Sequence, residues 1–260
     1  ILCNLVATYI ENGEVPYIGY EAARVNQMIE DISYNNAKNY FQFWSAHALS
    51  LIQHATLATP DFHFKQFTIR HDRSAMKVGT DGVLLGAWAW PYTEQTMTMK
   101  CLDIGTGTGL IALMLAQRFP AAHITGIDID DASLEQAKEN VEASPFRGQI
   151  HIKKQDFIDI DSFSNKSDII VSNPPFYKEE TLGGNQARDA ARHTTSLPFD
   201  LLIENANRLL SEKGLFCVII PYLEASSFIS MCAFKKLYLH RRLDVRSSER
   251  KPFKRALLEF

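Results

Sequence analysis

The feature that most constrains this 260-residue sequence is a run of alternating glycines between an apolar segment and a helical pattern. Residues 100–104 predict a short strand, and residues 109–119 predict a helix. Gly105, Gly107 and Gly109 lie at the junction, where glycines let the backbone turn sharply and let a ligand approach closely. A strand, a glycine turn and a helix in this order predict the start of a parallel, ligand-binding α/β sheet.

The alternation of strands and helices continues along the chain, with one helix, at 201–210, expected to end because of Gly214. Two late segments, 237–245 and 255–260, predict an antiparallel hairpin. The predicted fold class is therefore α/β: a Rossmann-like, doubly wound, mostly parallel sheet with an antiparallel edge hairpin. The other predicted strands are 123–128, 150–155, 168–172 and 215–220, and the other predicted helix is 132–143.

Composition limits the kind of protein that this can be. A hydrophobic content of 46% supports a buried core, and no apolar run approaches 18 residues, so we expect no membrane span. The four cysteines lie far apart without metal-ligand spacing, which predicts buried, reduced thiols, no metal site and a cytoplasmic location. They are Cys3, Cys101, Cys217 and Cys232.

The chain divides near Thr59 and Pro60, because proline disfavours a helix at the residue before it. Residues 1–60 carry no chemical motif and are expected to form a helical extension of unknown role. Residues 61–260 contain the whole α/β pattern and are expected to form the functional domain.

Three acids follow or end successive predicted strands, at the edge where open α/β sheets bind ligands. Asp103 precedes the glycine turn and suits a ligand that carries an ammonium group, as a methionine moiety does. Asp128 can accept hydrogen bonds from ribose hydroxyls, and Asp156 with Phe157 offers a carboxylate and a ring to an adenine. Together these residues predict a site for S-adenosylmethionine.

The most informative segment is Asn173-Pro174-Pro175-Phe176, which follows the strand at 168–172. An exocyclic amino nitrogen is a poor nucleophile because its lone pair is delocalised into the ring. The Asn173 side-chain oxygen and the Pro174 carbonyl can accept its two N–H groups and localise that lone pair, while Phe176 stacks on the base. Two prolines hold this arrangement rigidly. The segment predicts methyl transfer to a planar amine.

The acceptor pair does not distinguish among planar amines and amides. Adenine N6 in tRNA, guanine N2 in ribosomal RNA and a glutamine amide of a release factor all fit. An RNA-binding module without cofactor would leave the set of acids unexplained, and a nicotinamide oxidoreductase would leave Asn-Pro-Pro-Phe unexplained.

The 61–260 region resembles class I S-adenosylmethionine-dependent N-methyltransferases with an NPP[FY] motif, and more narrowly the bacterial enzymes that methylate adenine N6 of valine tRNA beside the anticodon. The resemblance rests on residues 62–67, residues 75–88 and the segment from Asn173 to Tyr177. It implies a seven-stranded sheet in the order 3-2-1-4-5-7-6. It also places Lys77, Thr80 and Asp81 at the helix that closes over the cofactor. This placement fits the residues themselves, since Thr80 can cap the N-terminus of a helix at 81–90.

The expected cofactor-binding set comprises strand-end acids, the glycine turn, the closing helix and the methyl-transfer asparagine. Its members are Lys77, Thr80, Asp81, Asp103, Gly105, Thr106, Gly107, Asp128, Ile129, Asp156, Phe157 and Asn173.

Charge is concentrated near the end of the chain, where nine Lys and Arg residues between 235 and 255 face only Asp244 and Glu249. Such a patch suits contact with RNA phosphates. We therefore expect a monomer that binds tRNA through Lys235, Lys236, Arg241, Arg242, Arg246, Arg250, Lys251, Lys254 and Arg255.

Overall fold

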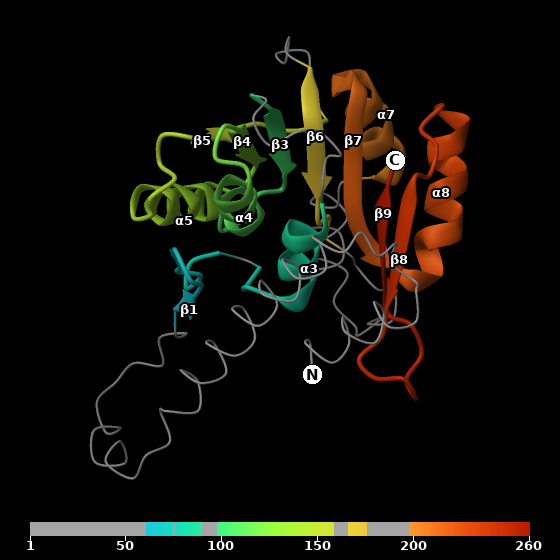
Figure 1. Ribbon diagram of the computed structural model, residues 1–260, viewed down its shortest axis with the longest axis horizontal. Helices are drawn as coiled ribbons and strands as arrows, with labels where there is room; N and C mark the ends of the chain where they lie inside the picture. Colours follow the sequence, from blue (N-terminus) through green and yellow to red (C-terminus); the bar gives the residue numbers. More distant parts are fainter. Residues whose placement is uncertain (1–60, 75, 90–97, 159–165, 176–197) are drawn as a thin grey trace, which may run out of the picture.

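The computed structural model describes residues 61–74, 76–89, 98–158, 166–175 and 198–260 (Figure 1). These residues form a seven-stranded sheet with helices on both faces, preceded by a small antiparallel pair of strands, β1 (Phe62–His63) and β2 (Thr68–Ile69). The expected helical extension at 1–60 lies outside the described residues.

The large sheet has the order β5-β4-β3-β6-β7-β9-β8, which confirms the predicted order 3-2-1-4-5-7-6 when its strands are numbered along the chain. Strands β5, β4, β3, β6 and β7 are parallel to one another, and β9 is antiparallel to both β7 and β8. The bounds are β3 (Lys100–Ile104), β4 (His123–Asp128), β5 (Ile150–Lys154), β6 (Ser167–Ser172), β7 (Leu210–Pro221), β8 (Arg241–Val245) and β9 (Arg255–Glu259).

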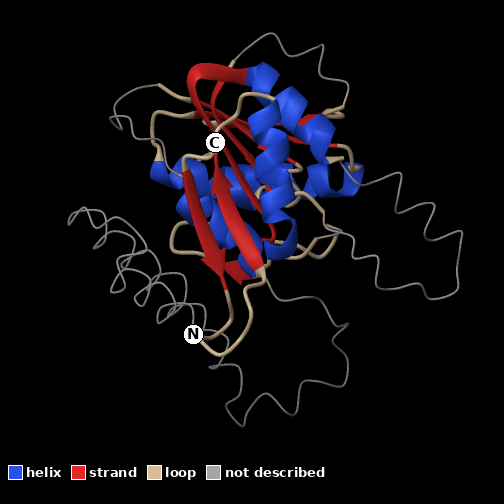
Figure 2. Cartoon of the chain, turned by 90° about the vertical axis from the view of Figure 1, so that its right-hand side faces the viewer, coloured by secondary structure: helices blue, strands red, loops and turns tan. Residues whose placement is uncertain are grey.

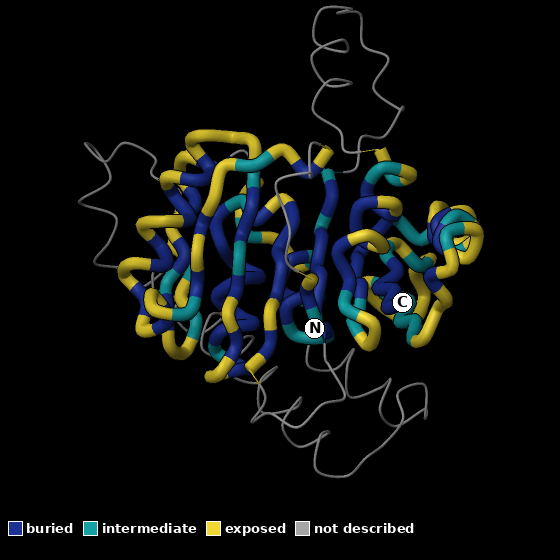
Figure 3. The backbone as a smooth tube through the Cα atoms, turned by 90° about the horizontal axis from the view of Figure 1, so that it is seen from above, coloured by how far each residue is buried: buried dark blue, intermediate teal, exposed yellow. Residues whose placement is uncertain are grey.

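The two faces of the sheet bury two separate hydrophobic clusters, because side chains alternate along each strand. Cys101 packs in one of these clusters, whereas its neighbour Leu102 packs in the other. The central strands are buried on both faces (Figure 3), as expected for a doubly wound sheet. The cluster that contains Cys101 is covered by α3 (Thr80–Trp88), α4 (Leu110–Arg118) and α5 (Asp131–Glu142), and the cluster that contains Leu102 is covered by α7 (Phe199–Leu209) and α8 (Ala225–Phe234). Figure 2 shows helices on both sides of the sheet.

Gly214 does not end a helix, contrary to the prediction. Helix α7 ends at Leu209, and Gly214 lies inside β7, opposite an irregularity in the pairing of β6 with β7 between Ser167 and Ile169. A Cβ at Gly214 would lie 2.9 Å from the Ser167 carbonyl oxygen. The glycine therefore permits close contact between two strands.

The strand predicted at 237–245 begins only at Arg241. Lys236 adopts a left-handed φ of 64°, and the Leu237 N–H donates to the Cys232 carbonyl at 2.9 Å. These features close the end of α8, so the residues that follow it belong to a helix end before the strand starts.

Helix α3 also differs from the prediction at its start. It begins at Thr80, and Gly79 occupies the N-cap position with no side-chain capping bond. The predicted role of Thr80 as cap is therefore wrong, since Thr80 is already a helical residue with an exposed side chain.

The ends of the parallel strands define what we call the carboxyl edge of the sheet. Helix α3 and the loop that joins β8 to β9 lie on this side of the molecule (Figure 1). The loop is there because β9 runs antiparallel to β7, with Arg255 at the start of β9 paired with Pro221 at the end of β7.

Candidate active site

The glycine turn after β3 contains three left-handed residues, with φ of 69° at Gly105, 55° at Gly107 and 80° at Gly109. Glycine adopts this conformation without the strain that a side chain would cause. The N–H groups of Gly105 and Thr106 both donate to the Ile127 carbonyl at 2.9 Å, which anchors the turn to the neighbouring strand β4.

Gly105 faces open space. An added Cβ would meet no atom of the residues that the structure describes within 4 Å, whereas a Cβ at Gly109 would lie 3.5 Å from the Cβ of Ala137 on α5. The two glycines therefore differ in what surrounds them although both have positive φ. Gly105 offers the exposed backbone that a ligand can approach.

Asp103 is completely buried on β3, directly before the turn. Its Oδ2 accepts hydrogen bonds from Thr106 Oγ1 at 2.7 Å and from the Ala112 N–H at 3.2 Å. Its Oδ1 is buried with no partner among the described residues. Burial raises the pKa of Asp103 to about 7, and the charge of Asp128 adds to this, although the two hydrogen bonds oppose it. A ligand ammonium group would satisfy the remaining oxygen.

Asp128 ends β4 and faces the turn. Its Oδ2 accepts from the Gly107 N–H at 2.8 Å, and its Oδ1 accepts from the N–H groups of Ile129 at 2.8 Å and Asp130 at 3.1 Å. These bonds fix the carboxylate where a ribose is expected. Asp130 in turn caps α5 through the Ser133 N–H at 2.8 Å.

The remaining members of the nucleoside set differ in exposure. Asp156 is exposed, and its Oδ1 accepts from the Ile158 N–H at 2.8 Å. The Phe157 ring packs in the core with Leu102 and is only 4% exposed, so little of its face is open to a ligand. Ile129 is 48% exposed beside Asp128 and provides the open apolar surface of this set.

Two residues expected at the closing helix, Lys77 and Asp81, form polar contacts with other parts of the chain. Lys77, before α3, donates from Nζ to the carbonyl oxygens of His71 at 2.6 Å and Asp72 at 3.1 Å. Asp81, in the first turn of α3, forms an ion pair with Arg255 at 2.7 Å. This pair joins α3 to the start of β9 at the carboxyl edge.

Asn173 lies at the tip of β6, next to the glycine turn. Ser172 is paired with Ile104 across β6 and β3, and its hydroxyl donates to the Ile104 carbonyl at 3.1 Å. The residues that follow, Asn173 and Gly105, therefore leave adjoining strands at the same level. The structure confirms the predicted proximity of these two segments.

The side-chain oxygen of Asn173 is buried and has no partner among the described residues. Pro174 is buried and Pro175 is half-buried, whereas Phe176 lies outside the described residues. A buried acceptor without a hydrogen bond is unfavourable. Asn173 Oδ1, like Asp103 Oδ1, can therefore accept a hydrogen bond from the N–H group of a ligand.

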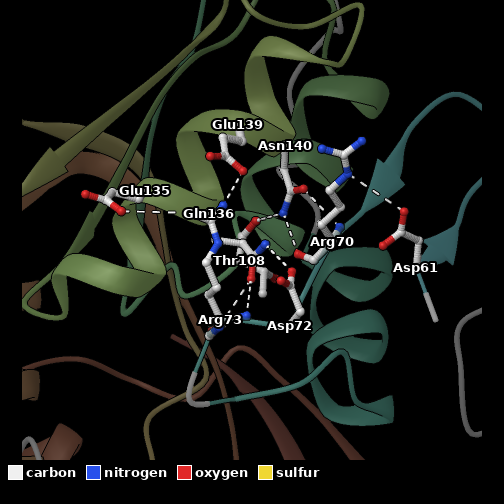
Figure 4. A network of polar contacts seen from close by, with 10 residues as sticks. Asp61, Arg70, Asp72, Arg73, Thr108, Glu135, Gln136, Glu139 and Asn140 are labelled. Atoms are coloured by element: carbon white, nitrogen blue, oxygen red, sulfur yellow. Dashed lines mark hydrogen bonds and ion pairs between the residues drawn. The ribbon is translucent and has the colours of Figure 1, made fainter. Parts of the chain in front are cut away.

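Sequence reasoning missed a cluster of hydrogen bonds beside the glycine turn, made by the side chains of Asn140 and Gln136, which we call the polar clasp (Figure 4). Asn140, on α5, is 2% exposed and donates from Nδ2 to the carbonyl oxygens of Thr108 and Arg70, each at 2.9 Å. Its Oδ1 accepts from the Arg70 N–H at 2.9 Å. One side chain thus ties the turn to the segment that leads into α3.

Gln136 continues the clasp one turn earlier on α5. It is fully buried, and its Oε1 accepts from the N–H groups of Arg73 at 2.8 Å and Ser74 at 3.2 Å. Its Nε2 donates to Asp72 Oδ1 at 2.8 Å, as the cluster in Figure 4 shows. The available sequence signal was a polar stripe of Ser133, Gln136 and Asn140 on the otherwise buried side of this helix.

The buried thiols are unsuited to nucleophilic chemistry. Cys101, Cys217 and Cys232 are buried and free. Burial raises the pKa of Cys101 and of Cys232 to about 12, so both remain protonated at neutral pH. Across the described ranges, no group of three or more His, Cys, Asp or Glu side chains is arranged to hold a metal. The helices that the structure describes are all too short or too polar to cross a membrane.

Comparison with known families supports a methyltransferase. The family described as "Methyltransferase small domain" matches residues 91–236, which include both the glycine turn and Asn173. Protein-L-isoaspartate(D-aspartate) O-methyltransferase matches residues 23–158, a match that ends before Asn173. Glucuronate isomerase matches only residues 1–41, outside the described part of the chain.

Two curated relatives share more of the chain. Proteins from Pectobacterium carotovorum and Bacteroides thetaiotaomicron are each 45% identical over 205 residues, which cover 78% of this chain and 81% and 84% of the relatives. Both are named tRNA1(Val) (adenine(37)-N6)-methyltransferase. A solved predicted O-methyltransferase from Agrobacterium tumefaciens shares the fold, with a TM-score of 0.53, 16% identity, and coverage of 69% of this chain and 79% of that chain.

Proposed function

Since the chain belongs to the family of tRNA1(Val) (adenine(37)-N6)-methyltransferases, we propose that it methylates the N6 amino group of an adenine in tRNA, with S-adenosylmethionine as donor. The target that the relatives' names give is adenine 37 of a valine tRNA. With tRNA as the substrate, we place the reaction in the cytoplasm.

The residues of the glycine turn fit the proposed donor. Asp103 Oδ1 is a buried acceptor for the methionine ammonium group, and the open side of Gly105 leaves room for the ligand. Asp128 and the exposed Ile129 would hold the ribose and the adenine. When bound here, S-adenosylmethionine supplies an electrophilic methyl group on a sulfonium.

Asn173 and Pro174 would activate the acceptor nitrogen. Asn173 Oδ1 and the Pro174 carbonyl accept its two N–H groups, so the lone pair is drawn out of conjugation and directed toward the donor methyl group. The prolines keep the two acceptors in fixed positions, which lowers the entropic cost of alignment. No strong base is required, because the nitrogen loses its extra proton readily after methylation.

The observation that carries this proposal is the buried side-chain oxygen of Asn173, which has no partner within the described part of the chain and lies at a strand tip that adjoins Gly105. The same acceptor pair suits guanine N2 of ribosomal RNA or a glutamine amide of a release factor. The family relationship favours adenine in tRNA over both.

Nucleoside mass spectrometry of tRNA that lacks the modification tests the proposal. We expect N6-methyladenosine only when both enzyme and S-adenosylmethionine are present. We expect no methylation of tRNA whose target adenine is replaced by guanine. Ribosomal subunits and a release factor serve as competing acceptors. Methylation of either competitor, with none in tRNA, would contradict the proposed substrate.

A further inference from the structure

The basic residues between 235 and 255 fall into two groups with different surroundings. Four of the nine are already neutralised by a carboxylate of the same chain, so their charges are less available to an external anion. These pairs are Lys235–Glu204, Arg241–Glu259, Arg242–Asp244 and Arg255–Asp81, at 2.9, 2.8, 2.8 and 2.7 Å.

Four of the remaining five lie together in residues 246–254, which we call the hairpin tip. Arg250, Lys251 and Lys254 are exposed, and none of them has a carboxylate partner among the described residues. Arg246 is half-buried and donates to the Glu249 carbonyl at 2.9 Å. Glu249 is the single acid within the tip, which therefore carries net positive charge.

The hairpin tip lies at the carboxyl edge, as Asn173 does. Val245 and Arg255, which flank the tip, are paired with each other, and Arg255 is also paired with Pro221 at the end of β7. Strand β7 runs parallel to β6, with Val218 opposite Ser172. Figure 1 shows the loop that joins β8 to β9 on the same side of the molecule as the end of β6. A nucleic acid that presents one base to Asn173 would therefore approach the molecule on the side of the tip.

The tip has an ordered framework rather than a loose chain. Lys254 donates its N–H to the Val245 carbonyl at 2.8 Å, and the Tyr222 N–H donates to the Lys254 carbonyl at 3.1 Å. The Tyr222 and Phe253 rings stack with centroids 5.2 Å apart, and the Arg246 guanidinium lies 5.1 Å from the Phe253 centroid. Because these contacts already order the tip, the entropic cost of ordering it when RNA binds is small.

We propose that the hairpin tip holds the phosphate backbone of the RNA that presents its base to Asn173, with Arg250, Lys251 and Lys254 as the phosphate contacts. Phe253 acts as a positioning residue that keeps Arg246 in place beside them. The inference rests on the proposed RNA substrate, and it assigns only a small role in RNA binding to the four basic residues of the segment that are paired with carboxylates.

The test compares two triple variants of the full chain that remove the same charge. The tip variant carries Arg250→Gln, Lys251→Gln and Lys254→Gln. The control variant carries Lys100→Gln, Lys138→Gln and Lys213→Gln, which are exposed residues at the start of β3, on α5 and near the start of β7. Binding of unmodified tRNA is measured as a function of salt, with steady-state methylation kinetics.

We expect the slope of log K against log salt to fall by about one unit for each tip side chain removed. The tRNA KM should rise at least about tenfold, with kcat retained at saturating tRNA, because the tip does not touch the reacting atoms. A variant with Arg250→Lys, Lys251→Arg and Lys254→Arg should restore binding. The control should match the wild type.

Equal salt slopes for the tip variant and the wild type would overturn the inference, as would equal losses in the tip and control variants. A wild-type chain that fails to methylate any tRNA would instead contradict the proposed function, so the two failures are distinguishable. Phe253→Leu gives a second check: it should raise the tRNA KM without changing S-adenosylmethionine binding, and an unchanged KM would remove Phe253 from its positioning role.

Discussion

Thr106 donates its hydroxyl to Oδ2 of Asp103 at 2.7 Å, while the other oxygen of the same carboxylate lies buried with no partner among the described residues. Burial raises the pKa of Asp103 to about 7, compared with an ordinary value of 3.8. The folded state therefore favours the protonated acid. Its contribution to stability is present at low pH and is lost as the pH rises through about 7.

Binding of S-adenosylmethionine should release a proton from Asp103, because the ligand ammonium group favours the charged carboxylate. Its affinity should consequently rise by about tenfold between roughly pH 6 and pH 8. Calorimetry in buffers of different ionisation enthalpy measures both effects. Asp103→Asn should weaken binding and remove this pH dependence; an unchanged dependence in the variant would assign it to another group.

Alanine at two glycines should separate the strain of the turn from contact with the cofactor. Gly105→Ala and Gly109→Ala both place a side chain at positive φ and should each lower the free energy of unfolding by about 1–2 kcal/mol. Only Gly105→Ala fills the open side of the turn, so it should also weaken S-adenosylmethionine binding by at least about tenfold. Thermal unfolding and calorimetry on both variants measure these quantities, and equal loss of affinity would contradict the location of the cofactor.

Removal of the clasp should destabilise the protein and loosen the cofactor turn. Asn140→Ala removes one buried and two partly buried hydrogen bonds, so the free energy of unfolding should fall by about 2–3 kcal/mol and the KM for S-adenosylmethionine should rise. Glu139→Ala, one residue away, removes only a half-exposed ion pair with Arg73 and should change stability by about 0.5 kcal/mol or less. Chemical denaturation measures the stability of both variants, and initial-rate kinetics measure their KM. Similar effects from the two variants would show that the hydrogen bonds of Asn140 do not stabilise the turn.

Much of the fold was predictable because the central strands are short, apolar and separated by clear helix signals. The bounds of β3 and β4 match the prediction. Errors arose where long-range contact decides the local structure. Gly214 resembles a helix stop, yet it permits close approach to Ser167 on another strand, which local sequence does not reveal.

The candidate site was predictable where its residues follow strand ends, since parallel strands bring Asp103, Asp128 and Asn173 to one edge. Asn140 was missed because a polar residue on a helix usually faces solvent, and only its partners on a distant segment explain its burial. Phe157 shows the reverse case: its ring belongs to the core, although its place after a strand-end acid suggested an open face.

The single-turnover rate of methyl transfer by Asn173→Ala, measured with saturating tRNA and S-adenosylmethionine, tests the central role given to this residue. Loss of one preorganised acceptor should slow the chemical step by about 10²–10³-fold. The dissociation constant for S-adenosylmethionine should change by less than about twofold, because the cofactor contacts of the glycine turn remain intact. An unchanged rate, or an equal loss of rate and cofactor affinity, would show that Asn173 does not activate the acceptor nitrogen.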